Sequence, residues 1–230
     1  MHSQRPQVEV AVVQTGGQRD AHGQAAQRSL AKAVRARTSI VTATGSQVLR
    51  LPQAAESPAL FATPLLYWPG AAAFAPLPVA AVQRLRRFVL AGGTLLFDER
   101  GRSRDFRQAV RALLRTMLPS APLQPLPRTH TVYRSFYLFR PEQTAAHASL
   151  QLEAVLLDGR AAVLYSAHDL GTGWQRGDQP EHPPRLPNAA ERALRLGVNI
   201  VTYALCLDYK DDQVHAPFLM RRRGRQTTAP

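Results

Sequence analysis

The chain has 230 residues, and 45% of them are hydrophobic, which is enough to build a core and argues against a disordered chain. The formal net charge of +13 comes almost wholly from arginine, because Lys32 and Lys210 are the only lysines. The arginines are spread over several predicted helices and lack interleaved aromatic residues. We therefore do not expect nucleic acid as a partner.

Membrane segments and a disulfide framework are also excluded by the sequence. No run approaches the roughly 18 to 20 apolar residues that cross a bilayer, and the N-terminus lacks the apolar stretch of a signal peptide. Taken as complete, the chain is expected to be cytoplasmic; excised from a longer protein, it would be membrane-associated. Cys206 is the only cysteine, which rules out a disulfide and a multi-cysteine metal site.

In the first half of the chain, segments typical of strands alternate with segments of helical periodicity. Residues 8–13 are rich in β-branched side chains, and Ala26, Leu30 and Val34 form one face of a helix over 24–37. The further expected elements are a short strand 39–42, an irregular segment 43–60, a strand 64–68, a helix from Pro78 to Gly92, a strand 94–97 and a helix 104–118.

The second half predicts a hairpin and a final helix. Four prolines make 119–127 an extended linker, and 131–138 is expected to be partly extended. Asp158-Gly159 between two apolar runs, 150–157 and 161–166, suits a type I′ turn. The further expectations are a long Gly/Pro loop 171–187 around Trp174 and a helix from Asn188 to Leu207 that buries Cys206 away from any cleft.

This alternation predicts an α/β fold with a doubly wound, mostly parallel sheet of the flavodoxin-like kind. The hairpin adds an antiparallel strand. We expect a flexible lead over 1–7, a single domain over 8–219 and a basic flexible tail over 220–230, where arginines are densest.

Several segments, in this order and spacing, carry a resemblance to a known family. They are 65–69 (LLYWP), 91–98 (AGGTLLFD), 134–138 (RSFYL), 158–166 (DGRAAVLYS) and 195–205 (RLGVNIVTYAL). Over roughly residues 8–219 the chain resembles the bacterial domain of unknown function 4159 family. The resemblance implies a fold similar to class I glutamine amidotransferases, and a BatA-like aerotolerance-regulator region before the domain in many relatives. It implies no catalytic residue, because the family has no established activity.

Polar and aromatic side chains follow four of the predicted strands. The carboxyl ends of parallel strands meet at one edge of a sheet, which is where ligands bind in doubly wound folds. Arg134 and Trp174 are expected to reach the same edge from loops. The candidate ligand-binding residues are Thr15, Gly16, Tyr67, Asp98, Arg134, Ser166, His168, Asp169 and Trp174.

Each candidate also has a structural interpretation. Thr15 and Gly16 suit an ordinary turn, and Asp98 suits a helix cap. Tyr67 and Trp68 alternate in direction, so at least one belongs to the core. Arg134 is expected as a buried partner of Asp98 or Asp169 that holds loops together.

Amidotransferase chemistry needs an activated cysteine on a tight strand-to-helix turn, and Cys206 lies in the final helix instead. Ser166, His168 and Asp169 are too close in sequence for a catalytic triad. The leading hypothesis is a non-catalytic pseudo-enzyme domain without a cofactor, which binds an unknown small molecule or a protein, a membrane-associated one included.

Three alternatives remain open. The first is a hydrolase that uses Asp98, Asp169 and a histidine. The second is binding of nucleic acid or an anionic membrane surface through arginines. The third is a metal site of His168, Asp169 and His182, although this spacing matches no recognised metal motif.

Overall fold

Strands and helices alternate along the chain, and the strands join in one sheet. The computed structural model describes residues 8–15, 20–43, 45–177 and 188–224, with side chains as far as Cys206. The strands are β1 (Val10–Thr15), β2 (Val48–Leu51), β3 (Leu65–Gly70), β4 (Thr94–Glu99), β5 (Gln124–Pro125), β6 (Glu153–Leu157) and β7 (Arg160–Ser166).

The seven-stranded sheet is mostly parallel and has an antiparallel edge. Its order is β2-β1-β3-β4-β7-β6-β5, and the first five strands of this order are parallel. β6 and β5 run antiparallel to their neighbours. The prediction that residues 8–13, 64–68, 94–97 and 161–166 share one sheet is thereby confirmed.

The predicted hairpin forms where Asp158 and Gly159 connect β6 to β7. Both residues have positive φ, 49° and 80°, as a type I′ turn requires. A β-bulge shifts the register between Val155 and Leu156. The sequence located this hairpin correctly because its turn depends on two adjacent residues.

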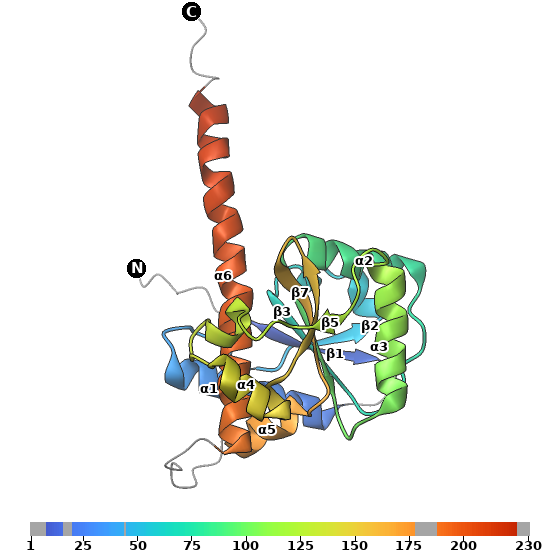
Figure 1. The fold of residues 1–230 in the computed structure, drawn as a ribbon. Helices are drawn as coiled ribbons and strands as arrows, with labels where there is room; N and C mark the ends of the chain where they lie inside the picture. The colour runs from blue at the N-terminus through green and yellow to red at the C-terminus, as the bar shows by residue number, and fades with distance from the viewer. Residues whose placement is uncertain (1–7, 16–19, 44, 178–187, 225–230) are drawn as a thin grey trace, which may run out of the picture.

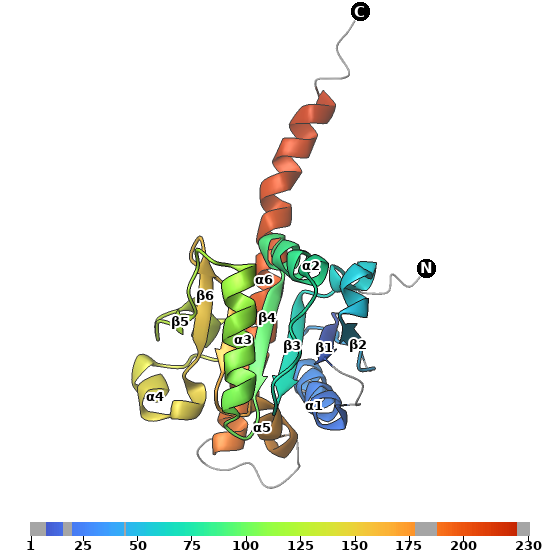
Figure 2. The same ribbon diagram turned by 90° about the vertical axis from the view of Figure 1, so that its right-hand side faces the viewer.

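Helices cover both faces of the sheet (Figures 1 and 2). α1 (Ala21–Arg37), α5 (Leu170–Gly177) and α6 (Ala189–Gly224) pack on one face, and α2 (Val79–Leu90) and α3 (Arg104–Met117) pack on the other. Alternate residues of β1 serve the two cores: Val10 and Val12 face the α1 side, whereas Ala11 and Val13 face the α2 side. Short helical elements complete the chain: η1 (Gln53–Glu56), η2 (Pro58–Leu60), η3 (Thr131–Arg134), α4 (Pro141–Ala146) and η4 (Ala148–Leu150).

Three predicted segments take a different conformation. The second strand is β2, not 39–42, because Thr42 donates its hydroxyl to the Ala31 carbonyl of α1 (2.9 Å) and makes only an isolated bridge to Val8. The segment 131–138 begins with the 3-10 turn η3. The linker 119–127 contains β5, which pairs with β6 at the edge of the sheet.

The prediction of a loop over 171–187 is wrong for its first part, because residues 170–177 form α5. Its glycines allow close packing: a Cβ on Gly171 would lie 2.4 Å from the Tyr67 hydroxyl, and one on Gly173 would lie 2.5 Å from the Ala193 Cβ. These glycines therefore fit a helix that lies against its neighbours. Residues 178–187 fall outside the described residues.

The final helix is longer than predicted, and Cys206 is exposed rather than buried. The buried stripe of α6 contains Leu194, Val198 and Val201. α6 extends well beyond the sheet (Figure 1). Residues up to Gly224 of the predicted basic tail belong to α6, whereas 225–230 and the lead 1–7 lie outside the described residues.

An ion pair between a buried carboxylate and a partly exposed guanidinium joins β4 to α3. Glu99 is fully buried, and both of its oxygens accept from Arg107, from Nε at 2.9 Å and from Nη2 at 2.8 Å. The Tyr165 hydroxyl of β7 also donates to Glu99. A buried carboxylate with three donors is well satisfied, but it depends on its guanidinium partner.

We expect Arg107→Ala to lower the free energy of unfolding by about 3 kcal/mol, because it leaves Glu99 buried without a cation. The matched control is Arg111→Ala, one turn further along α3. Arg111 pairs with Glu153 at 2.8 Å, but both side chains are partly exposed, so the expected loss is about 1 kcal/mol or less. Urea unfolding measures both values. Equal losses would show that the burial of Glu99 does not control the energy of its ion pair.

Candidate functional site

The carboxylate of Asp98 holds the first turn of α5 against the carboxyl end of β4. Its oxygens accept from the backbone N–H of Leu170 at 2.9 Å and of Gly171 at 2.8 Å. The Tyr67 hydroxyl of β3 adds a third donor at 2.9 Å. Asp98 is only 1% exposed. A carboxylate at the start of a helix satisfies N–H groups that have no partner within the helix.

Aromatic side chains pack over this cluster on the α5 side. Trp174 of α5 lies over Tyr67, with ring centroids 4.9 Å apart. Its indole Nε1 donates to the Ala193 carbonyl of α6 at 3.0 Å. Tyr67 and Trp174 are both fully buried. We call Tyr67, Asp98, Leu170, Gly171 and Trp174 the α5 anchor.

Asp169 lies beside the α5 anchor and turns the chain into α5. Its φ of 49° is in the left-handed region, which Asp tolerates better than most residues. Its carboxylate accepts from the backbone N–H and the hydroxyl of Thr172, at 3.1 and 2.9 Å. His22 of α1 lies 3.9 Å from Asp169 and 3.3 Å from the Thr172 hydroxyl. Asp169 thus links α5 to α1 at the surface.

The predicted site residues separate into different environments. Tyr67, Asp98, Asp169 and Trp174 come together, whereas Ser166 is fully buried and accepts from the His168 backbone N–H at 3.2 Å. The His168 side chain is exposed, and Gly16 lies outside the described residues. A further candidate, Thr15, lines an open cleft on the other side of β3.

The expected pairing of Arg134 with Asp98 or Asp169 is wrong. Arg134 is exposed on η3, whereas the described partners of Asp98 are the backbone of α5 and Tyr67. The backbone N–H groups take the role assigned to the arginine because α5 begins directly at the carboxylate. Asp98 is therefore held by neutral donors.

The open cleft begins in a crevice between the carboxyl ends of β1 and β3. Its volume is about 270 Å³, and Gln14, Thr15, Asp20 and Arg100 are its polar lining residues. β1 has β2 on one side and β3 on the other, and α1 and α2 lie on opposite faces of the sheet. This is the topological switch point, where open α/β sheets bind ligands.

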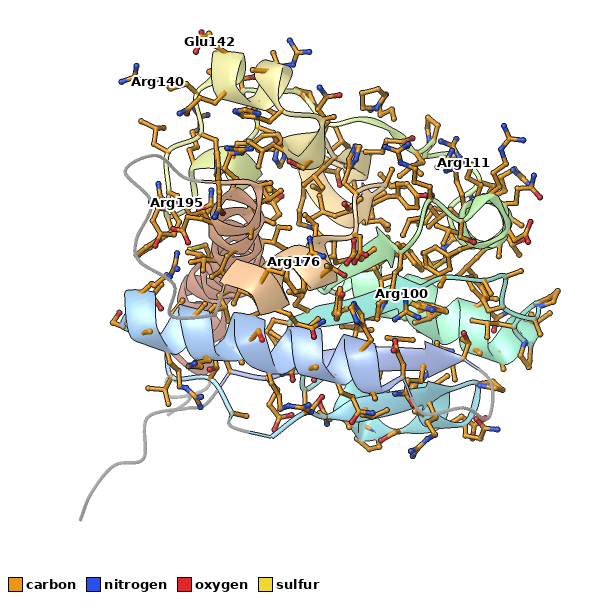
Figure 3. All side chains as sticks on the ribbon, turned by 90° about the horizontal axis from the view of Figure 1, so that it is seen from below. Arg100, Arg111, Arg140, Glu142, Arg176 and Arg195 are labelled. Atoms are coloured by element: carbon orange, nitrogen blue, oxygen red, sulfur yellow. The ribbon has the colours of Figure 1, made fainter. Side chains whose placement is uncertain are left out.

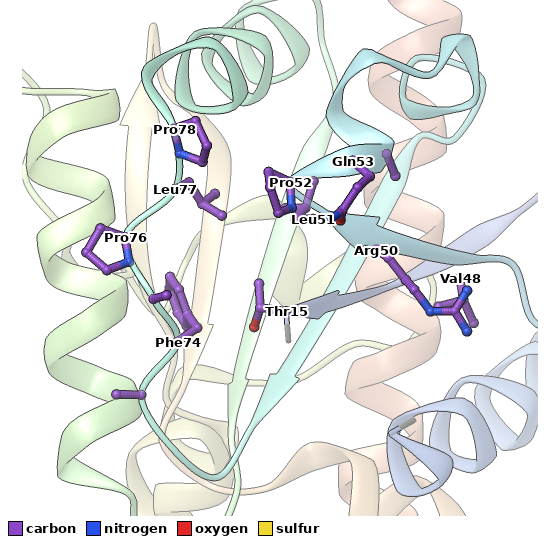
Figure 4. Close-up of a pocket in the computed structure, with 13 residues that line it drawn as sticks. Thr15, Val48, Arg50, Leu51, Pro52, Gln53, Phe74, Pro76, Leu77 and Pro78 are labelled. Atoms are coloured by element: carbon purple, nitrogen blue, oxygen red, sulfur yellow. The ribbon is translucent and has the colours of Figure 1, made fainter. Parts of the chain in front are cut away.

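A wider groove of about 970 Å³ continues from the crevice past Thr15 and Ala73. Figure 4 shows Thr15 between two walls, with Phe74 and Leu77 on one side and Leu51 and Pro52 on the other. Phe74 is held in place by Trp68, with ring centroids 4.9 Å apart. The groove is therefore largely apolar, and packing against Trp68 fixes Phe74 in its wall.

Gln14 is the unusual residue of the crevice. It is 4% exposed, and neither its amide nitrogen nor its amide oxygen has a hydrogen-bond partner. An amide buried without partners costs about 1–3 kcal/mol. Gln14 follows the apolar run of β1 at a buried position where a hydrophobic side chain would be expected. A buried polar group without a hydrogen-bond partner calls for an explanation, and a functional role is one such explanation.

Sequence reasoning selected Thr15 as a candidate but not the other cleft residues, although Gln14 stands beside it among the polar residues at the end of the first predicted strand. Gln14 was available as a polar interruption of an apolar strand, and Asp20 as the cap that accepts from Gly23 N–H at 2.9 Å. Arg100 lies two residues after Asp98, which had been singled out. Phe74 and Leu77 carried no signal, because they lie in an irregular segment.

The stability of the protein should depend on pH through Asp98. Burial raises the pKa of its carboxyl to about 7, against the lowering effect of the Gly171 and Leu170 N–H groups. The unfolded carboxyl has an ordinary pKa of about 3.9. The folded state therefore holds an extra proton between these values. Binding of this proton stabilises the folded state relative to the unfolded state. This contribution is complete below the unfolded pKa and is lost as the pH rises through about 7.

We compare the wild type with Asp98→Asn, which cannot titrate but keeps an acceptor oxygen. Lowering the pH from about 8 to about 5 should favour the wild type over the variant by about 2–3 kcal/mol. Urea unfolding at both pH values measures this difference. The effects of all other titrating groups cancel, because the wild type and the variant share them. A difference that does not change with pH would show that Asp98 stays ionised throughout.

Replacing Gln14 tests whether its amide is unsatisfied. Gln14→Met keeps the length of the side chain and removes the polar group, so we expect the free energy of unfolding to rise by about 1–2 kcal/mol. The matched control is Gln47→Met. Gln47 accepts from the Thr63 hydroxyl at 2.9 Å, and its replacement should lower stability by about 1 kcal/mol. Thermal unfolding of both variants decides the matter: a loss of stability in both would mean that Gln14 is satisfied within the protein.

Comparison with known proteins places most of this structure in one family. The family model described as a domain of unknown function (DUF4159) matches residues 9–205. The match extends from β1 into α6 and includes the α5 anchor and the cleft. A search of curated proteins finds no significant match.

Proposed function

Since the chain belongs to the DUF4159 family, whose description names no activity, we propose a function from the site itself. The domain binds a small molecule in the crevice between β1 and β3 and does not catalyse its conversion. The observation that carries the proposal is Gln14, an unpartnered buried amide in a crevice at the switch point of the sheet.

The proposal includes the finer fold class, a flavodoxin-like scaffold related to class I glutamine amidotransferases. The order β2-β1-β3-β4-β7 of the parallel strands supports it, because it follows the doubly wound pattern in which β1 lies between the second and third strands. In that pattern, ligands bind at the β1/β3 ends. The BatA-like context that the resemblance implies also belongs to this proposal.

A non-catalytic role is supported by the position of the nucleophiles. Cys206 lies in α6 and not in a turn that follows a strand, so it lacks the position of an amidotransferase nucleophile. The Thr172 hydroxyl does approach His22, but Asp169 lies near the same ring nitrogen, Nε2. A triad needs the carboxylate at the other ring nitrogen.

The hydrolase alternative would use Asp98 and Asp169, and their contacts argue against it. Both oxygens of Asp98 accept hydrogen bonds inside the α5 anchor, and the residue is nearly inaccessible. Asp169 caps α5 through Thr172. Each carboxylate therefore has a structural partner that a reaction would have to displace.

The second alternative, binding of nucleic acid or an anionic membrane surface through arginines, would need a continuous basic face. Figure 3 shows the labelled arginines on several separate elements. Some are paired with acids: Arg195 contacts Glu191 at 2.8 Å, and Arg111 contacts Glu153 at 2.8 Å. Within the described residues, no helix combines the length and apolarity needed to cross a membrane.

A thermal-shift screen of small metabolites tests the proposed function. A ligand at 100 times its dissociation constant stabilises the folded state by about 2.7 kcal/mol. We expect compounds that stabilise the wild type and the Gln47→Met control but not Gln14→Met. The bound compound should be recovered chemically unchanged.

Two results would contradict this proposal. In the first, every stabilising compound acts equally on the wild type and on Gln14→Met, which would place binding outside the crevice. In the second, the recovered compound is converted, which would make the domain an enzyme.

A further inference from the structure

We propose that the cleft binds an amphipathic acid: a small molecule with a carboxylate or phosphate group, an adjacent amide or hydroxyl, and an apolar body. The acid contacts Arg100, the amide or hydroxyl contacts Gln14, and the apolar body lies in the groove beside Phe74 and Leu77. This inference rests on the proposed function and specifies the class of its ligand.

Arg100 supplies the cation for the acid. Its backbone N–H donates to the Gly70 carbonyl at 2.8 Å, which fixes the residue at the wall of the crevice. Its guanidinium contacts Asp20 through one nitrogen at 3.5 Å, and Figure 3 shows it near the start of α1. A guanidinium carries five N–H donors. This single long contact therefore leaves donors for a bidentate interaction with an acid.

Asp20 does not cancel this preference for an anion. Its Oδ1 already accepts from the Gly23 N–H at 2.9 Å as the cap of α1. The first turn of α1 has no acidic residue, and a helix N-terminus attracts negative charge. In the adjoining groove, Arg50 is exposed and adds a second positive charge. The charged lining of the cleft therefore carries a net positive charge.

Gln14 determines the second group. Its amide offers two N–H donors and one acceptor oxygen, and all of them are unpaired. A ligand that satisfies both sides must itself both donate and accept. An amide or a hydroxyl does so, whereas a purely anionic group only accepts.

The apolar body follows from the groove that adjoins the crevice. Pro52, Phe74 and Leu77 face the open space from opposite walls (Figure 4). Phe74 also packs on Phe106, with ring centroids 6.0 Å apart, and Phe106 lines the crevice. The polar and apolar parts of the cleft are therefore in direct contact. A cleft with one polar part and one adjoining apolar part matches a molecule with one polar and one apolar end.

Size sets a further limit. The crevice of about 270 Å³ holds the volume of about nine water molecules, which suits an acid group with one neighbouring amide. The groove of about 970 Å³ leaves room for an aromatic ring or a short alkyl chain. We therefore test molecules of the size of an acylated amino acid.

The experiment is calorimetric titration of the intact chain with matched probes. N-acetylphenylalanine carries all three groups. N-acetylglycine lacks the apolar body, 3-phenylpropanoate lacks the amide, and N-acetylphenylalaninamide lacks the acid. We expect each loss to weaken binding at least about tenfold, or 1.4 kcal/mol. Titration with the phosphonate analogue of N-acetylphenylalanine distinguishes a carboxylate from a phosphate-like group, because the analogue that binds more tightly carries the acid that the cleft prefers.

Variants assign each group to its contact. Arg100→Gln should weaken N-acetylphenylalanine about tenfold and leave its amide analogue unchanged, and Leu77→Ser should abolish the advantage of the phenyl ring. The control is Arg86→Gln, an exposed arginine of α2 outside the cleft, which should change nothing. Thermal unfolding checks that each variant is folded.

The outcomes separate this inference from the proposed function. If none of the probes binds up to millimolar concentrations, or if Arg100→Gln binds as the wild type does, the ligand class is wrong. In that case, a Gln14-dependent compound from the thermal-shift screen would still support the proposed function. If probes bind equally to the wild type and to Gln14→Met, both proposals fail.

Discussion

The arrangement of the carboxyl edge depends on one buried carboxylate. Asp98 accepts the first two N–H groups of α5 and the hydroxyl of Tyr67, and so connects β4, β3 and α5. α5 in turn carries Trp174, which packs on Tyr67 and donates to α6. Without this acceptor, three buried donors would lose their partner, and the helix that covers this face would lose its attachment.

Two neighbouring polar regions at this edge differ in how far their groups are satisfied. In the α5 anchor, the hydrogen bonds of Asp98 and the packing of Trp174 are complete and water is excluded. In the crevice, Gln14 is just as buried but has no partner, and Arg100 makes one long contact. Complete satisfaction indicates a structural role for the α5 anchor, whereas the unpartnered amide of Gln14 supports the proposed ligand site.

The basic composition of the chain has a partly structural meaning. Arg107 neutralises the fully buried Glu99, and Arg37 and Arg195 both bind Glu191 between α1 and α6. Arg195 also lies over the ring of Tyr137 at 5.0 Å. Planar guanidinium groups suit such bidentate and stacked contacts. Net charge alone therefore does not identify the partner, whereas the surroundings of single arginines such as Arg100 are informative.

The sequence by itself determined the features that depend on neighbouring residues. Apolar periodicity located β1, β3, β4, β6, β7 and most helices, but not β2 or β5. The Asp158-Gly159 turn located the hairpin, and parallel strands required Asp98 and Asp169 to share an edge. Only the tertiary structure decided which groups satisfy each other. Asp98 is held by the backbone of α5 and not by Arg134, α5 is a helix despite its glycines, and Gln14 is left without a partner. Hydrogen bonds act over about 3 Å, and that distance depends on how helices pack, which residue periodicity does not record.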